Sequence, residues 1–163
     1  MLSKTIEKAI NEQIKEELHS AHIYLAMSAY CEAINFKGFA QWMRKQSQEE
    51  LTHGIKLFDY INNRQGRVEL HAIPKPPLEF SSLLDMFQQV LKHEQKVTGM
   101  IHDLYKLAVK ENDYSTQIAL HWFIEEQVEE EKMANEIIAQ LEMAGEQPAA
   151  LMMLDSQMGA RMA

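Results

Sequence analysis

Six side chains that can bind metal ions recur at helical spacing along this sequence. They are Glu17, Glu50, His53, Glu94, Gln127 and Glu130. Glu50 and His53 are three residues apart, and so are Gln127 and Glu130, which places each pair on one face of a helix about one turn apart. Carboxylate oxygens with one imidazole nitrogen suit iron or manganese, and zinc can compete for them. The spacing therefore indicates a metal site built from several helices.

Each of these side chains interrupts an apolar stripe in which the apolar residues recur every three or four positions. Four such stripes can be traced, at about residues 10–28, 39–60, 83–108 and 120–141. Apolar residues at this spacing form the buried face of a helix. The interruptions lie near the midpoints of the expected helices, so helices running in either direction bring them to one depth. We expect a single polar layer across the core of a helical bundle.

Electrostatics favours cations in that layer. Four ionised carboxylates in an apolar core would cost several kcal/mol each without compensation, and the centres of the four stripes contain no Lys or Arg. Two divalent cations would cancel the four negative charges. The absence of thiolates from the layer argues against a structural zinc site or an iron–sulfur cluster.

The periodic segments predict an all-α fold in a single domain covering residues 1–163, with a bundle at about 3–143. Its expected helices cover residues 3–33, 38–65, 81–111, 114–143 and 148–160. All four prolines fall outside these helices. Ser81 and Ser82 are candidate caps for the third helix, and Gly66 and Gly145 are placed to end helices.

The lengths of the connections constrain the topology. Those at about 34–37 and 112–113 are short enough only for antiparallel neighbours. The middle connection, residues 66–80, is long enough to cross the bundle lengthwise and contains the proline-rich segment IPKPP, which suits an extended strap. We therefore predict a four-helix bundle with one long crossover, in which the second and third helices are parallel.

Composition excludes several classes of partner. The chain has 163 residues, 46% of them hydrophobic, and a formal net charge of −8. An acidic surface argues against nucleic acid and anionic membranes, and no apolar run approaches the ~20 residues of a membrane span. The N-terminus lacks the apolar core of a secretory signal. The lone Cys31, expected to be a small buried hydrophobe, fits a reducing compartment, so we expect a cytoplasmic protein.

Other candidate residues carry weaker signals. Tyr24, one heptad beyond Glu17, could hydrogen-bond a ligand or donate an electron, or be a plain core aromatic. The residues Glu49, Glu126 and Glu129 flank the primary candidates and could form a third cation site or a solvated acidic face. The off-stripe histidines are expected at or just below the surface: His19, His22, His71, His93, His102 and His121.

The final segment, PAALMMLDSQMGARM, is short, apolar and rich in methionine. Apolar patches of this kind usually mark assembly surfaces. A contact between subunits is therefore expected, and packing of an extra turn on its own bundle is the alternative.

At these residues the chain resembles the bacterial non-haem ferritins of the ferritin-like di-iron superfamily, over essentially its whole length. The segments that carry the resemblance are KEELHSAHIYLAM, QEELTHGIKLFDYI, HEQKVT and EEQVEEE. The resemblance implies a ferritin-like four-helix bundle with a short C-terminal fifth helix. It also implies iron storage in a homo-oligomer of 24 subunits, with oxidation of Fe²⁺ by dioxygen or hydrogen peroxide.

The same resemblance implies roles for individual residues. Glu17, Glu50 and His53 would hold one iron ion, and Glu50 would bridge to a second ion held by Glu94 and Glu130. Gln127 would orient water or oxygen beside that second ion. Glu49, Glu126, Glu129 and Glu130 match the family's third iron site, and Tyr24 matches its central tyrosine.

The chain differs from the bacterioferritins in two features, one of which bears on haem binding. Bacterioferritins have a second Glu-x-x-His where this chain has Gln127-x-x-Glu130, and a haem-binding methionine where it has Leu51. No haem is therefore expected. Two rival functions stay open: a structural bundle in which a metal only replaces core packing, and a di-iron oxidase or peroxidase that acts without storing iron.

Overall fold

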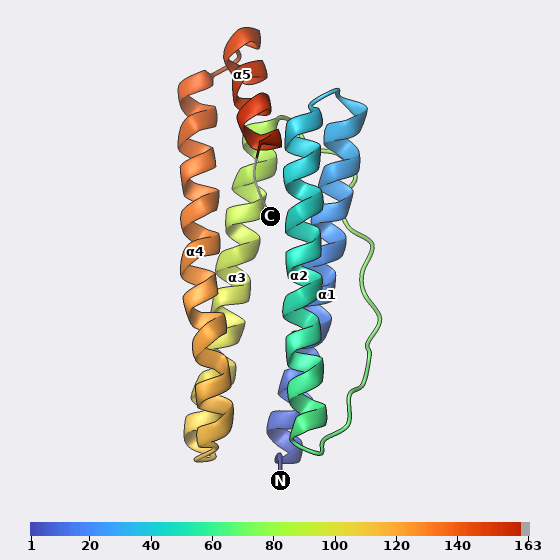
Figure 1. Ribbon diagram of the computed structural model, residues 1–163, viewed down its shortest axis with the longest axis vertical. Coiled ribbons are helices and arrows are strands. Elements are labelled where there is room, and N and C mark those ends of the chain that lie inside the picture. Colours follow the sequence, from blue (N-terminus) through green and yellow to red (C-terminus); the bar gives the residue numbers. More distant parts are fainter. Residues whose placement is uncertain (161–163) are drawn as a thin grey trace.

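The computed structural model describes residues 1–160, which form five helices and contain no strand (Figure 1). The helices are α1 (Lys4–Ala33), α2 (Lys37–Asn63), α3 (Leu83–Lys110), α4 (Tyr114–Ala144) and α5 (Pro148–Gly159). All predicted helix ends agree with these bounds to within two residues. The expected single domain runs to residue 163, so its last three residues lie outside the described part.

The predicted topology is confirmed. Helices α1 and α2 form one antiparallel hairpin, and α3 and α4 form another (Figure 1). Residues 64–82 connect them as an extended segment that runs the length of the bundle beside α1, so α2 and α3 are parallel. No helix within residues 1–160 combines the length and apolar character needed to cross a membrane.

Side-chain oxygens cap the first turns of three helices. Ser3 accepts a hydrogen bond from the Ile6 backbone N–H at the start of α1, and Ser82 accepts one from Asp85 at the start of α3. Asp113 caps α4 and also forms a two-fold ion pair with Arg64, with both nitrogen–oxygen distances at 2.9 Å. Each cap satisfies a backbone donor that the helix itself cannot pair.

Three helices end at a non-glycine residue with left-handed backbone. Asn35, Gln65 and Asn112 have φ angles of 64°, 56° and 54°. Asparagine adopts this conformation at modest cost because its short polar side chain can bond locally. Gly145 ends α4 as predicted, with φ of 56°. The expectation for Gly66 was wrong by one position, because Gln65 takes the left-handed conformation there.

Buried polar side chains on α1 hold the crossover in place. Asn11 donates to the carbonyl of Arg67 and accepts from the N–H of Glu69, at 3.0 and 2.9 Å. Glu7 accepts from the Arg67 N–H at 3.1 Å. These bonds satisfy backbone groups in a segment that has no helix or sheet partners of its own.

The core consists of two apolar clusters separated along the bundle axis. One contains Met27, Phe39 and Phe87, and the other contains Ile14, Ile101 and Phe123. In sequence, the polar interruptions of all four stripes fall between the two clusters. The predicted polar layer therefore lies at the middle of the bundle, with apolar packing above and below it.

Helix α5 packs on its own chain through one face. Leu154 and Met158 are buried in the first cluster, whereas Met152 and Met153 are 69% and 67% exposed. Asp155 accepts a hydrogen bond from the Phe39 N–H at 2.9 Å and so caps α2, which has no side-chain cap of its own. The packing alternative is thus confirmed for one face of α5, and the other face is free to meet a second subunit.

Close approach of α5 to α2 requires a glycine, which gives a first prediction. A Cβ on Gly38 would lie 1.7 Å from the carbonyl oxygen of Asp155. We expect Gly38→Ala to destabilise the protein by roughly 1–3 kcal/mol, the usual range for overpacking. Differential scanning calorimetry should show a lower thermal midpoint. Gly99→Ala is the matched control, because a Cβ there meets nothing within 4 Å and alanine favours a helix interior, so its midpoint should not fall.

Candidate metal centre

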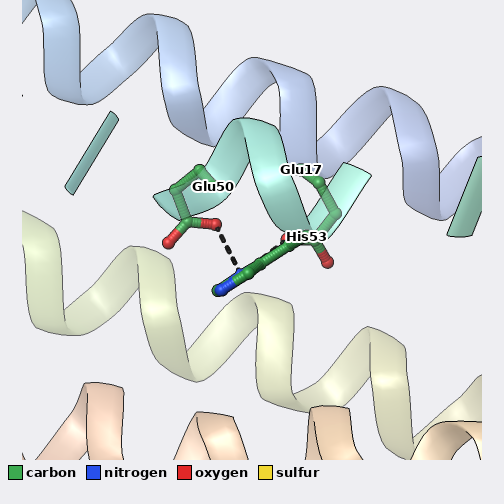
Figure 2. Close-up of side chains that lie close together, drawn as sticks. All are labelled: Glu17, Glu50 and His53. Atoms are coloured by element: carbon green, nitrogen blue, oxygen red, sulfur yellow. Dashed lines mark ion pairs between the residues drawn. The ribbon is translucent and has the colours of Figure 1, made fainter. Parts of the chain in front are cut away.

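Helices α1 and α2 supply the first group of convergent ligands. The Nδ1 atom of His53 lies 3.4 Å from a carboxylate oxygen of Glu50 and 3.7 Å from one of Glu17 (Figure 2). All three residues are buried, with exposed fractions of 4% or less. One ligand atom from each comes within 4.8 Å of the other two, which is close enough for a shared cation.

A second group joins α2 to the other hairpin. Glu50, Glu94 and Glu130 each place a carboxylate oxygen within 4.8 Å of the others, and all three are buried. Glu50 therefore belongs to both groups. The structure brings together the five residues expected to hold two iron ions, and it places Glu50 between the two halves of the centre.

Glu94 is held by two hydrogen bonds from neighbouring helices. Tyr24 on α1 donates its hydroxyl to one carboxylate oxygen, and Gln127 on α4 donates its amide to the other at 3.1 Å. Gln127 also lies 3.2 Å from the hydroxyl of Thr98. The amide expected to orient water or oxygen thus donates to Glu94 in this structure, and Tyr24 hydrogen-bonds a candidate ligand, one of the two roles expected for it.

Two further glutamines contact the centre and were missed as site residues by the sequence analysis. Gln13 donates to Glu17 at 2.7 Å, and Gln46 donates to Glu130 at 2.7 Å and to Glu50 at 3.3 Å. Gln13 is four residues before Glu17, and Gln46 is four before Glu50. The i,i+4 spacing was the available signal, since residues four apart on a helix are neighbours.

Burial shapes the protonation of the centre. It raises the pKa of Glu130 to about 8 and raises those of Glu50 and Glu94 above their usual range. Burial alone would lower the pKa of His53, but the carboxylates of Glu17 and Glu50 raise it to about 11. Without metal, the centre therefore retains protons near neutral pH. Cations would take the place of those protons.

The hydrogen-bond pattern supports cation binding. Among the described residues, two buried side-chain atoms have no hydrogen-bond partner: Oε2 of Glu17 and Oε1 of Glu130. One belongs to each group of ligands. Buried carboxylate oxygens without donors are costly, and one divalent cation in each group would satisfy the open oxygen there. The donor set of carboxylates and one imidazole fits iron.

A third convergent group consists of His53, Glu126 and Glu130. The Nε2 atom of His53 lies 4.0 Å from Glu126, whose side chain is 32% exposed. Glu129 is not part of this group, and its exposed carboxylate lies 3.8 Å from the Lys132 ammonium. A third site made of Glu49, Glu126, Glu129 and Glu130 stays a prediction.

The remaining predicted positions agree with the sequence analysis. Cys31 is buried, and burial raises the pKa of its thiol to about 12, as befits an unreactive core residue. The off-stripe histidines lie at or just below the surface: His19, His22, His71, His93, His102 and His121.

A four-helix bundle with carboxylates and a Glu-x-x-His motif at its centre is typical of the dinuclear carboxylate proteins, although this chain has Gln127-x-x-Glu130 in place of a second such motif. Residues 7–144 match the Ferritin-like domain family, and the chain belongs to the ferritin family. It is 40% identical over 161 residues to the bacterial non-heme ferritin of Staphylococcus aureus strain USA300. That alignment covers 99% of this chain and 97% of the relative. The ferritin of Staphylococcus saprophyticus is 42% identical, covering 99% and 96%.

Solved structures agree with this assignment. An open pore ferritin from the hyperthermophilic archaeon Archaeoglobus fulgidus superimposes with a TM-score of 0.98 at 43% identity. The match covers 99% of this chain and all of that one. The ferritin fold therefore extends over the whole described chain, including α5.

Proposed function

We propose that this iron-storage ferritin is a ferroxidase that oxidises Fe²⁺ with dioxygen between its four helices and stores the Fe³⁺ as a mineral inside a shell. The observation that carries the proposal is the pair of ligand groups that share Glu50. Glu17, Glu50 and His53 would receive one ferrous ion, and Glu50, Glu94 and Glu130 the other. Family membership and the names of the relatives support iron as the metal.

Two sites side by side suit the chemistry of dioxygen. Each Fe²⁺ gives up one electron, so two ions and two protons convert one O₂ into one H₂O₂ and two Fe³⁺. Because one shared carboxylate would hold both ions next to each other, a single O₂ molecule could receive both electrons at one site. Iron is the substrate here, and the protein contributes the ligands and their placement.

The residues around the ligands protect that placement. Burial, and next the charge of Glu94, raise the pKa of Tyr24 well above its usual range, so its hydroxyl stays protonated and can donate to Glu94. The ring of Trp122 packs edge-on against His53, with centroids 5.2 Å apart. The two apolar clusters exclude bulk water from both sides of the layer.

Storage requires assembly, and we propose a homo-oligomeric shell of 24 subunits in the cytoplasm. The exposed face of α5 around Met152 and Met153 supports a subunit contact, because isolated apolar surface of this kind favours association. The buried free thiol of Cys31 fits a reducing compartment.

Size-exclusion chromatography after aerobic loading with Fe²⁺ tests storage directly. The proposal predicts that iron far in excess of two ions per chain elutes with a large assembly, and that oxygen is consumed during loading. Two tightly held ions per chain without further uptake would favour a non-storage oxidase. Metal binding without oxygen consumption would favour a structural bundle.

Separate variants should divide the centre into its two halves. We expect Glu17→Ala and Glu130→Ala each to remove one of two Fe²⁺ binding steps, because each residue belongs to only one of the two groups that share Glu50. Anaerobic isothermal titration calorimetry measures both steps. Unchanged stoichiometry in both variants would contradict the assignment of the ligands.

A further inference from the structure

We propose that Gln13 and Gln46 are positioning residues for the two iron subsites. Each fixes one oxygen of a carboxylate ligand, so that the other oxygen faces the ion as a single-oxygen ligand. The inference rests on the proposed function, since it takes both carboxylates to be iron ligands. Each glutamine donates a hydrogen bond to a carboxylate of one ligand group.

Gln13 serves the first subsite from within α1. Its Nε2 donates to Oε1 of Glu17 at 2.7 Å, and both side chains are buried, with residue exposures of 2% and 1%. The other oxygen of Glu17, Oε2, accepts no hydrogen bond and lies 3.7 Å from Nδ1 of His53. The bonded oxygen is therefore fixed on the helix, and the unbonded one is directed at the ligand group.

Gln46 serves the second subsite across the bundle. Its Nε2 donates from α2 to Oε2 of Glu130 on α4 at 2.7 Å, and it also lies 3.3 Å from Oε1 of Glu50. Gln46 is fully buried. The other oxygen of Glu130, Oε1, accepts no hydrogen bond. The arrangement made within α1 at Glu17 is thus repeated in the second ligand group by side chains of α2 and α4.

The two open oxygens and the two glutamine hydrogen bonds belong to the same two carboxylates. Among the described residues, the two buried side-chain atoms without a hydrogen bond are the second oxygens of the two carboxylates that these glutamines hold. Glu94 differs, because Tyr24 and Gln127 donate to both of its oxygens. The donors leave one oxygen open at each end of the centre.

Amide chemistry explains why glutamine suits this position. An ionised carboxylate only accepts hydrogen bonds, so the amide must present its nitrogen. The amide is neutral and adds no charge to a layer that already holds four carboxylates. A carboxylate that binds the ion through only one oxygen leaves coordination positions on the ion open for dioxygen. Outer partners of this kind typically change metal affinity about 10–100-fold when removed.

Methionine variants test the proposal, because methionine has nearly the shape of glutamine and cannot donate. Anaerobic titration with Co²⁺, followed by its visible absorption, reports the affinity and coordination number of each ion. The step lost in Glu17→Ala identifies the first subsite, and the step lost in Glu130→Ala identifies the second. We expect Gln13→Met to weaken the first step about tenfold and spare the second.

Gln46→Met should show the opposite preference, weakening the second step about tenfold, with a smaller effect on the first through Glu50. In both variants the absorption of the affected ion should change, because the released carboxylate can bind through both oxygens. The matched control is Gln89→Met, which removes an exposed glutamine that donates to Asp85 at 3.2 Å on the surface of α3. It should change neither step.

Two results would overturn the proposal. One is wild-type affinity and absorption for both ions in both variants. The other is equal weakening of both steps in each variant together with a lower thermal midpoint, as a general packing defect would produce. Failure of the proposed function is separate, because it would appear in the wild-type protein as the absence of paired Co²⁺ binding or of Fe²⁺ oxidation.

Discussion

Glu50→Ala is expected to lower the initial rate of Fe²⁺ oxidation about 100-fold or more, the largest loss among the single ligand variants. Glu50 belongs to both ligand groups, so its removal disturbs both ions and the contact between them. Loss of outer partners alone typically costs 10–100-fold, and loss of a shared ligand should exceed that range. Stopped-flow absorbance after mixing with oxygenated buffer measures the rate.

A suitable control for Glu50→Ala removes a carboxylate far from the centre. Glu136 on α4 is exposed, and Glu136→Ala should oxidise iron at the wild-type rate. Because loss of a buried side chain can also leave a cavity, Glu50→Gln provides a near-isosteric second variant, and it should be similarly slow. Wild-type rates in both Glu50 variants would refute the bridging role.

The stability of the metal-free protein is expected to fall as pH rises from about 6.5 to about 8. In this window the folded protein holds protons that the unfolded chain has released. Burial raises the pKa of Glu130 to about 8, and the neighbouring carboxylates raise that of His53 to about 11. Each raised group contributes stability that is lost with increasing pH, at up to about 1.4 kcal/mol per pH unit.

The lower limit of the window is set by a histidine whose pKa is lowered in the folded protein, so that it stabilises the protein as pH rises. Burial lowers the pKa of His93 to about 4, so this group adds stability as pH rises from about 4 to 6.5 and adds none beyond. Above about pH 6.5 the groups of the polar layer should therefore determine how stability changes with pH. Thermal midpoints at fixed protein concentration measure the slope, and Glu130→Gln should make it shallower.

Saturating Co²⁺ should reverse that slope, since the cation binds ionised carboxylates and neutral imidazole more tightly as protons leave. At a free concentration of 100 times the dissociation constant, binding adds about 2.7 kcal/mol of stability. A metal-free midpoint that rises with pH over the same window would contradict the protonation pattern of the centre. A slope that Co²⁺ leaves unchanged would do so as well.

The sequence predicted the bundle because its signals are local and repeated. The apolar stripes and the residues between them predicted the helix ends to within two residues. Two short connections and one long connection were then compatible with one simple topology. Glu17, Glu50 and Glu94 could be identified because carboxylates are conspicuous on an apolar stripe. Their convergence followed from equal depth in helices of similar length.

Features that depend on contacts between distant segments could not be predicted. Glu7 and Asn11 lie outside the central stripe, and their burial depends on the path of the crossover over α1. The cap that Asp155 gives to α2 requires α5 to fold back on the bundle. Gln13 is different, because it lies four residues before Glu17 on the same helix, and that spacing could have identified it.

Anomalous X-ray diffraction from crystals soaked anaerobically in Fe²⁺ would locate the ions themselves. We expect two iron peaks per chain in the polar layer. One should lie among Glu17, Glu50 and His53, and the other among Glu50, Glu94 and Glu130, with Glu50 contacting both. A layer without iron, or with Glu17 and Glu94 turned to solvent, would contradict it.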